Sequence, residues 1–209
     1  MRRIRTPLLV TAGAVAVLGL AACAPGDGGG DVPSSSVASP SSSVSQPVAP
    51  TAVAGIAPGF DIPACEAQIE ATAVQYSLGP DISFIADVTD TWEPVGPAAT
   101  AALAGAEAAT ACLWGVPNSG RGVTIAIAEL AEPTRDALIA ELEGSGAFFA
   151  DAEGEARVFT ADGLESGDVT TAAAYVFDGA AWVSVSGGEL VDAAAAREIA
   201  RTVRASLAP

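Results

Sequence analysis

Residues 123–130 read VTIAIAEL, and this stretch decides the kind of fold to expect. Bulky β-branched residues at positions 123, 125 and 127 alternate with small residues at 124, 126 and 128. Alternation with period two is typical of a β-strand, because successive side chains point to opposite faces of a sheet. We therefore expect a strand with one bulky face and one small face.

Other short stretches rich in β-branched and aromatic side chains predict further strands, joined by hairpins. The turns Glu153-Gly154 and Asp178-Gly179 each stand between two such stretches. Tight turns that contain glycine join antiparallel neighbours in a sheet. The expected strands are residues 82–85, 110–116, 148–149, 157–159, 170–177 and 182–186.

Apolar residues at helical spacing predict three helices, and the alanine-rich residues 98–109 predict a fourth. The helix after the central strand is expected to have Gly144 at its C-cap. The expected helices are residues 63–76, 98–109, 133–143 and 190–207.

Helices around a run of hairpin-connected strands indicate an α+β domain, in which an antiparallel sheet carries helices packed on one face. The hydrophobic core is expected to contain Ile125, Ile127, Leu138, Leu142, Val158, Val176, Val183, Ile199 and Val203.

The N-terminus reads as an export signal that ends at a cysteine. Arg2, Arg3 and Arg5 precede the uncharged apolar residues 8–20, which are too few to span a bilayer comfortably. The run ends in Leu20-Ala21-Ala22-Cys23, which looks like a bacterial lipobox. We therefore interpret residues 1–22 as a lipoprotein signal peptide and Cys23 as the lipidated residue of a membrane-anchored, extracytoplasmic protein. The alternative is an ordinary signal peptide followed by a chance cysteine.

Residues 23–59 comprise this cysteine and a disordered Ser/Pro/Gly tether. Serine, proline and glycine make up 20 of the 36 residues from 24 to 59. Such a segment buries too little apolar surface to offset the entropy of ordering it. The remaining residues, 60–209, have the length of a single domain.

The composition excludes several kinds of chemistry. The 209 residues contain no histidine and no lysine, so all nine positive side chains are arginines. This excludes a Ser-His or Cys-His nucleophile, a lysine Schiff base and an imidazole metal site. A formal net charge of -16 also argues against nucleic acid as a partner. No cofactor is expected.

Cys65 and Cys112 are the two thiols of the expected domain. In an oxidising compartment such an isolated pair is usually a disulfide. The alternatives are a redox-active pair or a metal site, which the absence of a Cys-x-x-Cys motif and of histidine disfavours.

Four features occur together in this chain. They are the lipobox, the Ser/Pro tether, Cys65 soon after a proline, and Cys112-Leu113-Trp114-Gly115 ahead of a long strand. In this layout the chain resembles small actinobacterial cell-envelope lipoproteins of unknown function that carry a Cys…Cys-x-Trp pair. The resemblance implies an anchored extracytoplasmic domain with one disulfide, and it implies no particular activity.

Carboxylates are the remaining candidates for acid–base chemistry, as in the cleavage of wall glycan. Three groups lie in turns rich in glycine or threonine, where acids usually face water, and no Asp-x-Asp-x-Asp-Gly calcium loop occurs. Glu129 and Glu198 lie beside core positions, but on separate elements. The three groups are Glu153 with Glu155, Asp162 with Glu165 and Asp168, and Asp87 with Asp90 and Glu93.

Two further sets of side chains have alternative interpretations. Arg197, Arg201 and Arg204 form a ridge on the last helix, which either offsets the acidic surface and the helix dipole or binds an anion. The aromatic residues either pack in the core or offer stacking platforms to sugars. Of these, Trp114 is expected to pack over the disulfide and Trp92 to be exposed. The aromatic set is Tyr76, Trp92, Trp114, Tyr175 and Trp182.

The sequence thus predicts a membrane-anchored lipoprotein whose domain is a non-enzymatic binding or interaction module of the cell envelope. Its partner would be an envelope protein or a small ligand. The alternative function is a cell-wall glycan hydrolase that uses paired carboxylates.

Overall fold

A computed structural model describes residues 55–166 and 169–207 of the chain. The expected signal peptide, Cys23 and most of the expected tether lie outside the described residues, as does Asp168. Within the described part, no helix is long and apolar enough to cross a membrane.

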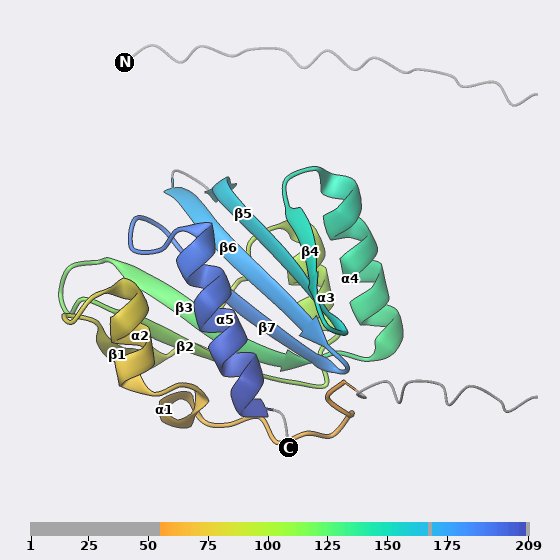
Figure 1. The fold of residues 1–209 in the computed structure, drawn as a ribbon, viewed down its shortest axis with the longest axis horizontal. Helices are drawn as coiled ribbons and strands as arrows, with labels where there is room; N and C mark the ends of the chain where they lie inside the picture. The colour runs from red at the N-terminus through yellow and green to blue at the C-terminus, as the bar shows by residue number, and fades with distance from the viewer. Residues whose placement is uncertain (1–54, 167–168, 208–209) are drawn as a thin grey trace, which may run out of the picture. The chain divides into compact units, whose positions relative to one another are not determined.

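Seven antiparallel strands in the described residues form one sheet, with the order β1-β2-β3-β7-β6-β5-β4 (Figure 1). The expected antiparallel sheet of an α+β fold is therefore confirmed. The strands are β1 (Ser83–Asp87), β2 (Ala108–Gly115), β3 (Gly122–Glu129), β4 (Phe149–Glu153), β5 (Ala156–Ser166), β6 (Val169–Asp178) and β7 (Ala181–Gly187).

The stretch at residues 123–130 lies at the centre of this sheet as β3. Ile125 is in register with Cys112 of β2 on one side and with Val185 of β7 on the other. Both expected hairpins are present, β4–β5 and β6–β7. Gly154 and Gly179 at their turns have φ of 66° and 58°, which a side chain other than glycine rarely adopts.

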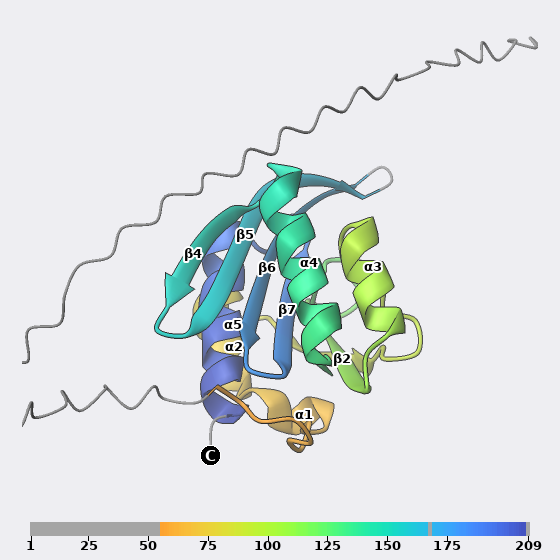
Figure 2. The ribbon, with the colours of Figure 1, turned by 90° about the vertical axis from the view of Figure 1, so that its right-hand side faces the viewer.

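Helices cover both faces of the sheet, so the expectation that they pack on one face is wrong. Figure 2 shows α3 and α4 in front of the sheet and α5 behind it, and α1 and α2 pack with α5. The helices are α1 (Cys65–Gln68), α2 (Ala71–Leu78), α3 (Pro97–Ala104), α4 (Glu132–Ser145) and α5 (Ala193–Leu207).

The reason is that both faces of the central strands are buried. Ala126 and Ala128 on the small face of β3 are as inaccessible as Ile125 and Ile127 on the bulky face. Small residues there leave room for large aromatic side chains from neighbouring strands: Ala128 is in register with Trp182 of β7. A small face is therefore not a solvent face.

All nine expected core residues are buried, but they belong to two cores. Leu138 and Leu142 lie with the rings of Trp92, Phe159, Tyr175, Phe177 and Trp182 in what we call the aromatic core. The other seven lie on the opposite face, with the disulfide and Trp114, in the aliphatic core.

The expected helix boundaries differ from the structure at several points. The helix expected at 63–76 is divided into α1 and α2, because Ile69 and Glu70 have extended backbone angles. The alanine-rich stretch 98–109 is helical only as far as Ala104, and its last residues begin β2. The C-cap of α4 is Gly146 in a left-handed conformation, rather than Gly144.

The folded part of the chain includes five residues that were expected in the tether. Residues 55–63, which we call the strap, run along one end of the sheet before α1 (Figure 1). The side chain of Ile56 is buried, and its carbonyl oxygen accepts a hydrogen bond of 2.7 Å from the Ala180 amide. A Cβ on Gly179 would come within 2.0 Å of that oxygen, so the strap requires glycine there.

Candidate functional site

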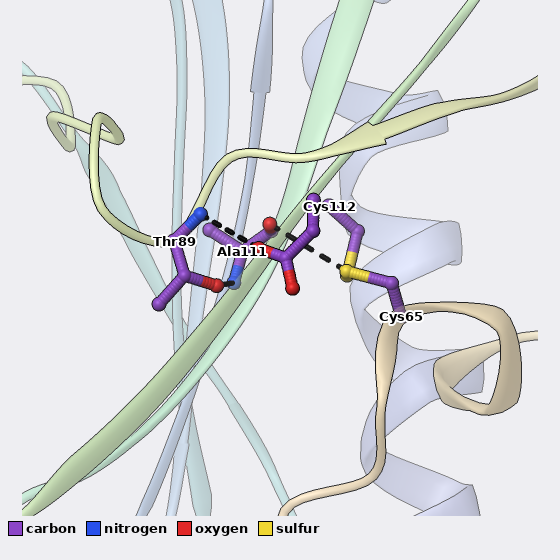
Figure 3. The surroundings of a disulfide bond; sticks show 5 residues. Cys65, Thr89, Ala111 and Cys112 are labelled. Atoms are coloured by element: carbon purple, nitrogen blue, oxygen red, sulfur yellow. Dashed lines mark hydrogen bonds between the residues drawn. A yellow bond between two sulfur atoms is a disulfide. The ribbon is translucent and has the colours of Figure 1, made fainter.

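The structure contains the predicted disulfide between Cys65, at the start of α1, and Cys112 in β2. Both residues are buried in the aliphatic core, and Cys65 Sγ lies 3.6 Å from the carbonyl oxygen of Ala111 (Figure 3). Because β2 pairs with β1 and β3, the disulfide fixes the α1 end of the chain to the body of the sheet. This is a structural crosslink, sealed from solvent.

Asp87, the first acid of one candidate group, stabilises the turn beside this disulfide. Its carboxylate accepts a hydrogen bond of 2.9 Å from the Thr89 amide, and the Thr89 hydroxyl accepts one of 2.9 Å from the Ala111 amide. The first of these bonds lowers the pKa of Asp87. Asp90 shares a shallow hollow with Asp87, and Glu93 lies exposed beyond it. A solvated turn therefore accounts for this group.

Glu153 and Glu155 have separate environments. The Glu153 carboxylate accepts a hydrogen bond of 2.9 Å from Arg197 Nε, and its other oxygen lies 2.8 Å from Arg201 Nε. Glu155 lies exposed in the turn between β4 and β5. One carboxylate is thus held by two arginines while the other faces water, and the structure does not pair them over a common site.

Asp162 caps the helix on which the arginines lie. Its carboxylate accepts a hydrogen bond of 2.8 Å from the Ala193 amide at the start of α5, and Asp192 does the same for the Ala195 amide. Carboxylates in this position satisfy the free amides of a helix N-terminus. Glu165 lies exposed on β5, away from this contact.

The arginine ridge of α5 is engaged with carboxylates along its length. Arg197 binds Asp151 and Glu153, and these contacts raise the pKa of its guanidinium. The pKa of Asp151 is lowered, first by the hydrogen bond from the Ala152 amide and then by Arg197. Arg204 donates a hydrogen bond of 2.6 Å from Nε to Asp178 at the end of β6. The ridge therefore fastens α5 to the sheet, which disfavours the alternative that it binds an anion.

Of the five aromatic residues considered as stacking platforms, four are buried and Tyr76 is exposed. Trp92, which was expected to be exposed, is only 8% accessible and packs against Trp182 with ring centroids 5.8 Å apart. The chain after β1 folds back over the aromatic core at this point, and the Tyr175 hydroxyl donates a hydrogen bond of 2.7 Å to the Val95 carbonyl there. Tyr76 on α2 is 92% exposed.

Trp114 packs on the disulfide side of the sheet as expected, edge-on to Phe84 at 5.8 Å.

The two acids beside core positions, Glu129 and Glu198, also have separate partners. Glu129 accepts a hydrogen bond of 2.6 Å from the Gly59 amide of the strap, and Glu198 pairs with Arg201. No cluster of three or more acids and cysteines in the described part of the chain has the arrangement of a metal site.

A hollow lies between the strap and the end of α5, and we call it the base groove. Its volume is about 1040 Å³. Apolar side chains supply most of its wall: Ala57, Pro58 and Phe60 of the strap, Ala67 of α1, and Leu207 of α5. The sequence did not predict this groove, because residues 55–59 of the strap were expected in the tether, although Ile56 is an apolar residue amid Pro and Gly.

The charged side chains at the base groove that have no ion-pair partner among the described residues are acidic. Arg204 lines it but is held by Asp178, while Asp61 and Glu155 line it without an ion-pair partner among the described residues. A smaller hollow of about 400 Å³ lies between α3 and α4 and is walled mainly by alanines, including Ala101.

Comparisons of the chain with protein-family models, with curated proteins and with solved structures find no match.

Proposed function

We propose that this protein is a lipid-anchored module of the cell envelope that works by binding a ligand or partner rather than by turnover. The observation that carries the proposal is the base groove. It has the volume of a ligand site and a largely apolar wall, which is typical of binding sites for organic molecules and peptide segments.

The positions of the carboxylates support binding over catalysis. Acid–base catalysis by carboxylates needs two of them over one site, with one kept protonated by its environment. Here Glu153 is held by two arginines, and Asp162 caps α5. These roles are structural, and they take up one carboxylate from each of two groups that the hydrolase alternative would use.

The ligand of the base groove has apolar groups for its wall and a neutral or cationic polar end. Asp61 and Glu155 would repel an anionic ligand, and the guanidinium of Arg204 already faces Asp178. An extended segment with apolar side chains and a basic group fits this description.

A pair of tryptophan variants tests the groove in the chain from residue 24 onward. Ala67→Trp places a large ring in the base groove, whereas Ala101→Trp places the same ring in the hollow between α3 and α4. Titration with an apolar amine such as decylamine, followed by amide NMR shifts, should show binding that Ala67→Trp abolishes and Ala101→Trp retains. Equal binding to both variants contradicts the assignment of the groove.

The anchor has its own test, which rests on the apolar run that ends at Cys23. In a bacterial host, the unchanged chain should partition into detergent and carry acyl chains on Cys23, whereas Cys23→Ser should be released from the membrane fraction. Retention of Cys23→Ser in that fraction contradicts lipidation. Turnover of wall glycan that is lost on replacing one carboxylate would establish the hydrolase instead.

A further inference from the structure

The two edges of the sheet differ in how well they are closed to another strand. The β1 edge has a register shift between Phe84 and Ala86, which leaves Ile85 as a bulged residue, and Gln75 of α2 donates a hydrogen bond to the Ile82 carbonyl just before β1. Bulges and covering elements prevent strand addition. The β4 edge pairs with β5 in unbroken register from Phe149 to Glu153, and its first four residues are exposed.

The free backbone groups of the β4 edge belong to Ala150 and Ala152. Glu153 and Ala156 close the two-residue β4–β5 turn, and hydrogen-bonded pairs alternate along an antiparallel ladder. The amide and carbonyl groups of residues 149, 151 and 153 therefore face β5, whereas those of 150 and 152 face outward. In agreement, the Ala152 amide donates to Asp151 Oδ1 at 2.8 Å rather than to β5.

The side chains along this edge define what an added strand would meet. Phe148 stacks on Tyr175 in the aromatic core, with centroids 5.4 Å apart, and this leaves the next ring, Phe149, 80% exposed. Phe149 and Asp151 lie on the same face of β4, because side chains alternate along a strand. An incoming strand thus faces an aromatic ring and, two residues along, a carboxylate whose Oδ2 is bound by Arg197 at 2.7 Å and whose Oδ1 accepts the Ala152 amide.

The net negative charge of the domain favours a partner segment that carries a basic side chain. Residues 1–54 contain three of the nine arginines and two of the 25 acids, so the rest of the chain has six arginines against 23 acids. Five of those six arginines form ion pairs with acids in the described residues. A second copy of this chain paired antiparallel about Asp151 would place two Asp151 side chains opposite each other, which is unfavourable.

We propose that the β4 edge accepts an extended segment of a partner protein as an eighth strand. The segment carries an apolar side chain against Phe149 and a lysine or arginine opposite Asp151. A carbonyl of the segment replaces Asp151 Oδ1 as the acceptor for the Ala152 amide, and this oxygen is then free to bind the basic side chain. In the absence of a partner, Asp151 protects the edge.

A heptapeptide probe, Thr-Val-Thr-Lys-Thr-Val-Thr with blocked ends, tests the proposal. Its central lysine is flanked on the same face by two valines, so it fits β4 in either direction. Titrated into the chain from residue 24 onward, which contains the whole sheet, both cores and the disulfide, it should shift the amide NMR signals of residues 149–153. The same peptide with glutamate in place of lysine should bind about tenfold more weakly or not at all.

Variants of β4 separate strand addition from general attraction of a cation to an acidic surface. Ala150→Pro removes an outward amide that takes no part in the β5 ladder, and it should weaken binding of the lysine peptide about tenfold. Ala150→Val keeps the amide and should bind like the unchanged chain. If Ala150→Pro loses the folded NMR spectrum, Asp151→Asn decides, because it should abolish the preference for lysine over glutamate. Shifts centred away from β4, or no binding, would overturn the proposal.

Discussion

On one face of the sheet, α5 lies close to the strands, with Cα atoms within 8 Å of those in β5, β6 and β7. On the other face, the close Cα approaches of α4 are mainly to α3. The helix of the aliphatic core presents Ala196 and Ala200, both inaccessible, to strands that carry valines. The strands of the aromatic core carry the large rings themselves and hold α4 at a greater distance.

The comparison shows that one sheet can be covered by two different means. The aliphatic face combines a close helix with a disulfide and a row of ion pairs. The aromatic face relies on rings in contact, in which Trp182 touches Trp92, Tyr175 and Phe177. The following changes test how much the stability of the fold depends on the interactions of each face.

Trp182→Ala should have the largest effect on stability. The side chain is fully buried at the centre of the aromatic core, and truncation of such a residue typically costs about 3–5 kcal/mol. Its neighbour Val183→Ala, on the aliphatic face, is the matched control and should cost about 1.5–3 kcal/mol. Urea unfolding measures both, and an equal or larger cost for Val183→Ala would contradict the central role of the ring.

Loss of the disulfide should come next. Cys65→Ala opens the crosslink between α1 and β2, and removal of a native disulfide typically lowers the free energy of unfolding by about 2–5 kcal/mol. Reduction of the unchanged chain with dithiothreitol should give a similar loss. Mass spectrometry of non-reduced protein checks the premise, because two free thiols would contradict the crosslink.

The aromatic face should also be sensitive to alkali. Burial raises the pKa of Tyr175 well above its usual value near 10. Above pH 10 the unfolded chain loses the Tyr175 proton while the folded chain keeps it, so stability should fall with rising pH by about 1.4 kcal/mol per pH unit. Tyr175→Phe should remove this slope, and unfolding curves between pH 9 and pH 11 measure it. An unchanged slope in the variant would contradict the buried state of the hydroxyl.

The ion pairs of the aliphatic face should contribute least. Arg197→Gln removes the contacts with Asp151 and Glu153, and it should cost about 0.5–1 kcal/mol because these groups are partly solvated. The pKa of folded Asp151 is lowered, first by the Ala152 amide and then by Arg197, so the part that depends on Arg197 is present above the unfolded value near 4 and is lost as the pH falls through the folded value. The difference between the variant and the unchanged chain should therefore shrink below pH 4, and a difference that persists at pH 2 would contradict this account.

Much of the secondary structure could be predicted because the signals are local. The alternation at residues 123–130, the glycine turns at 154 and 179, and the helical spacing after residue 190 each depend on residues within a few positions of one another. The expected helix at 63–76 is divided in the structure because Ile69 and Glu70 have extended backbone angles. The residues around this break contain no glycine or turn motif that would have predicted it. Of the acids expected in turns, Asp90, Glu93 and Glu155 lie outside strands, but Asp162 and Glu165 lie in β5, and the partners of the acids were not predicted.

The sequence by itself determined the antiparallel strands, the hairpins and the choice of Cys65 and Cys112 as partners, since period-two patterns, turn glycines and an isolated thiol pair are visible in the chain. Only the tertiary structure decided that helices cover both faces, that Trp92 is buried and that the α5 arginines bind acids. Glu153 and Arg197 are 44 residues apart, and Ile56 and Ala180 are still further apart. Such contacts depend on how the whole sheet brings distant segments together, and no local pattern encodes that.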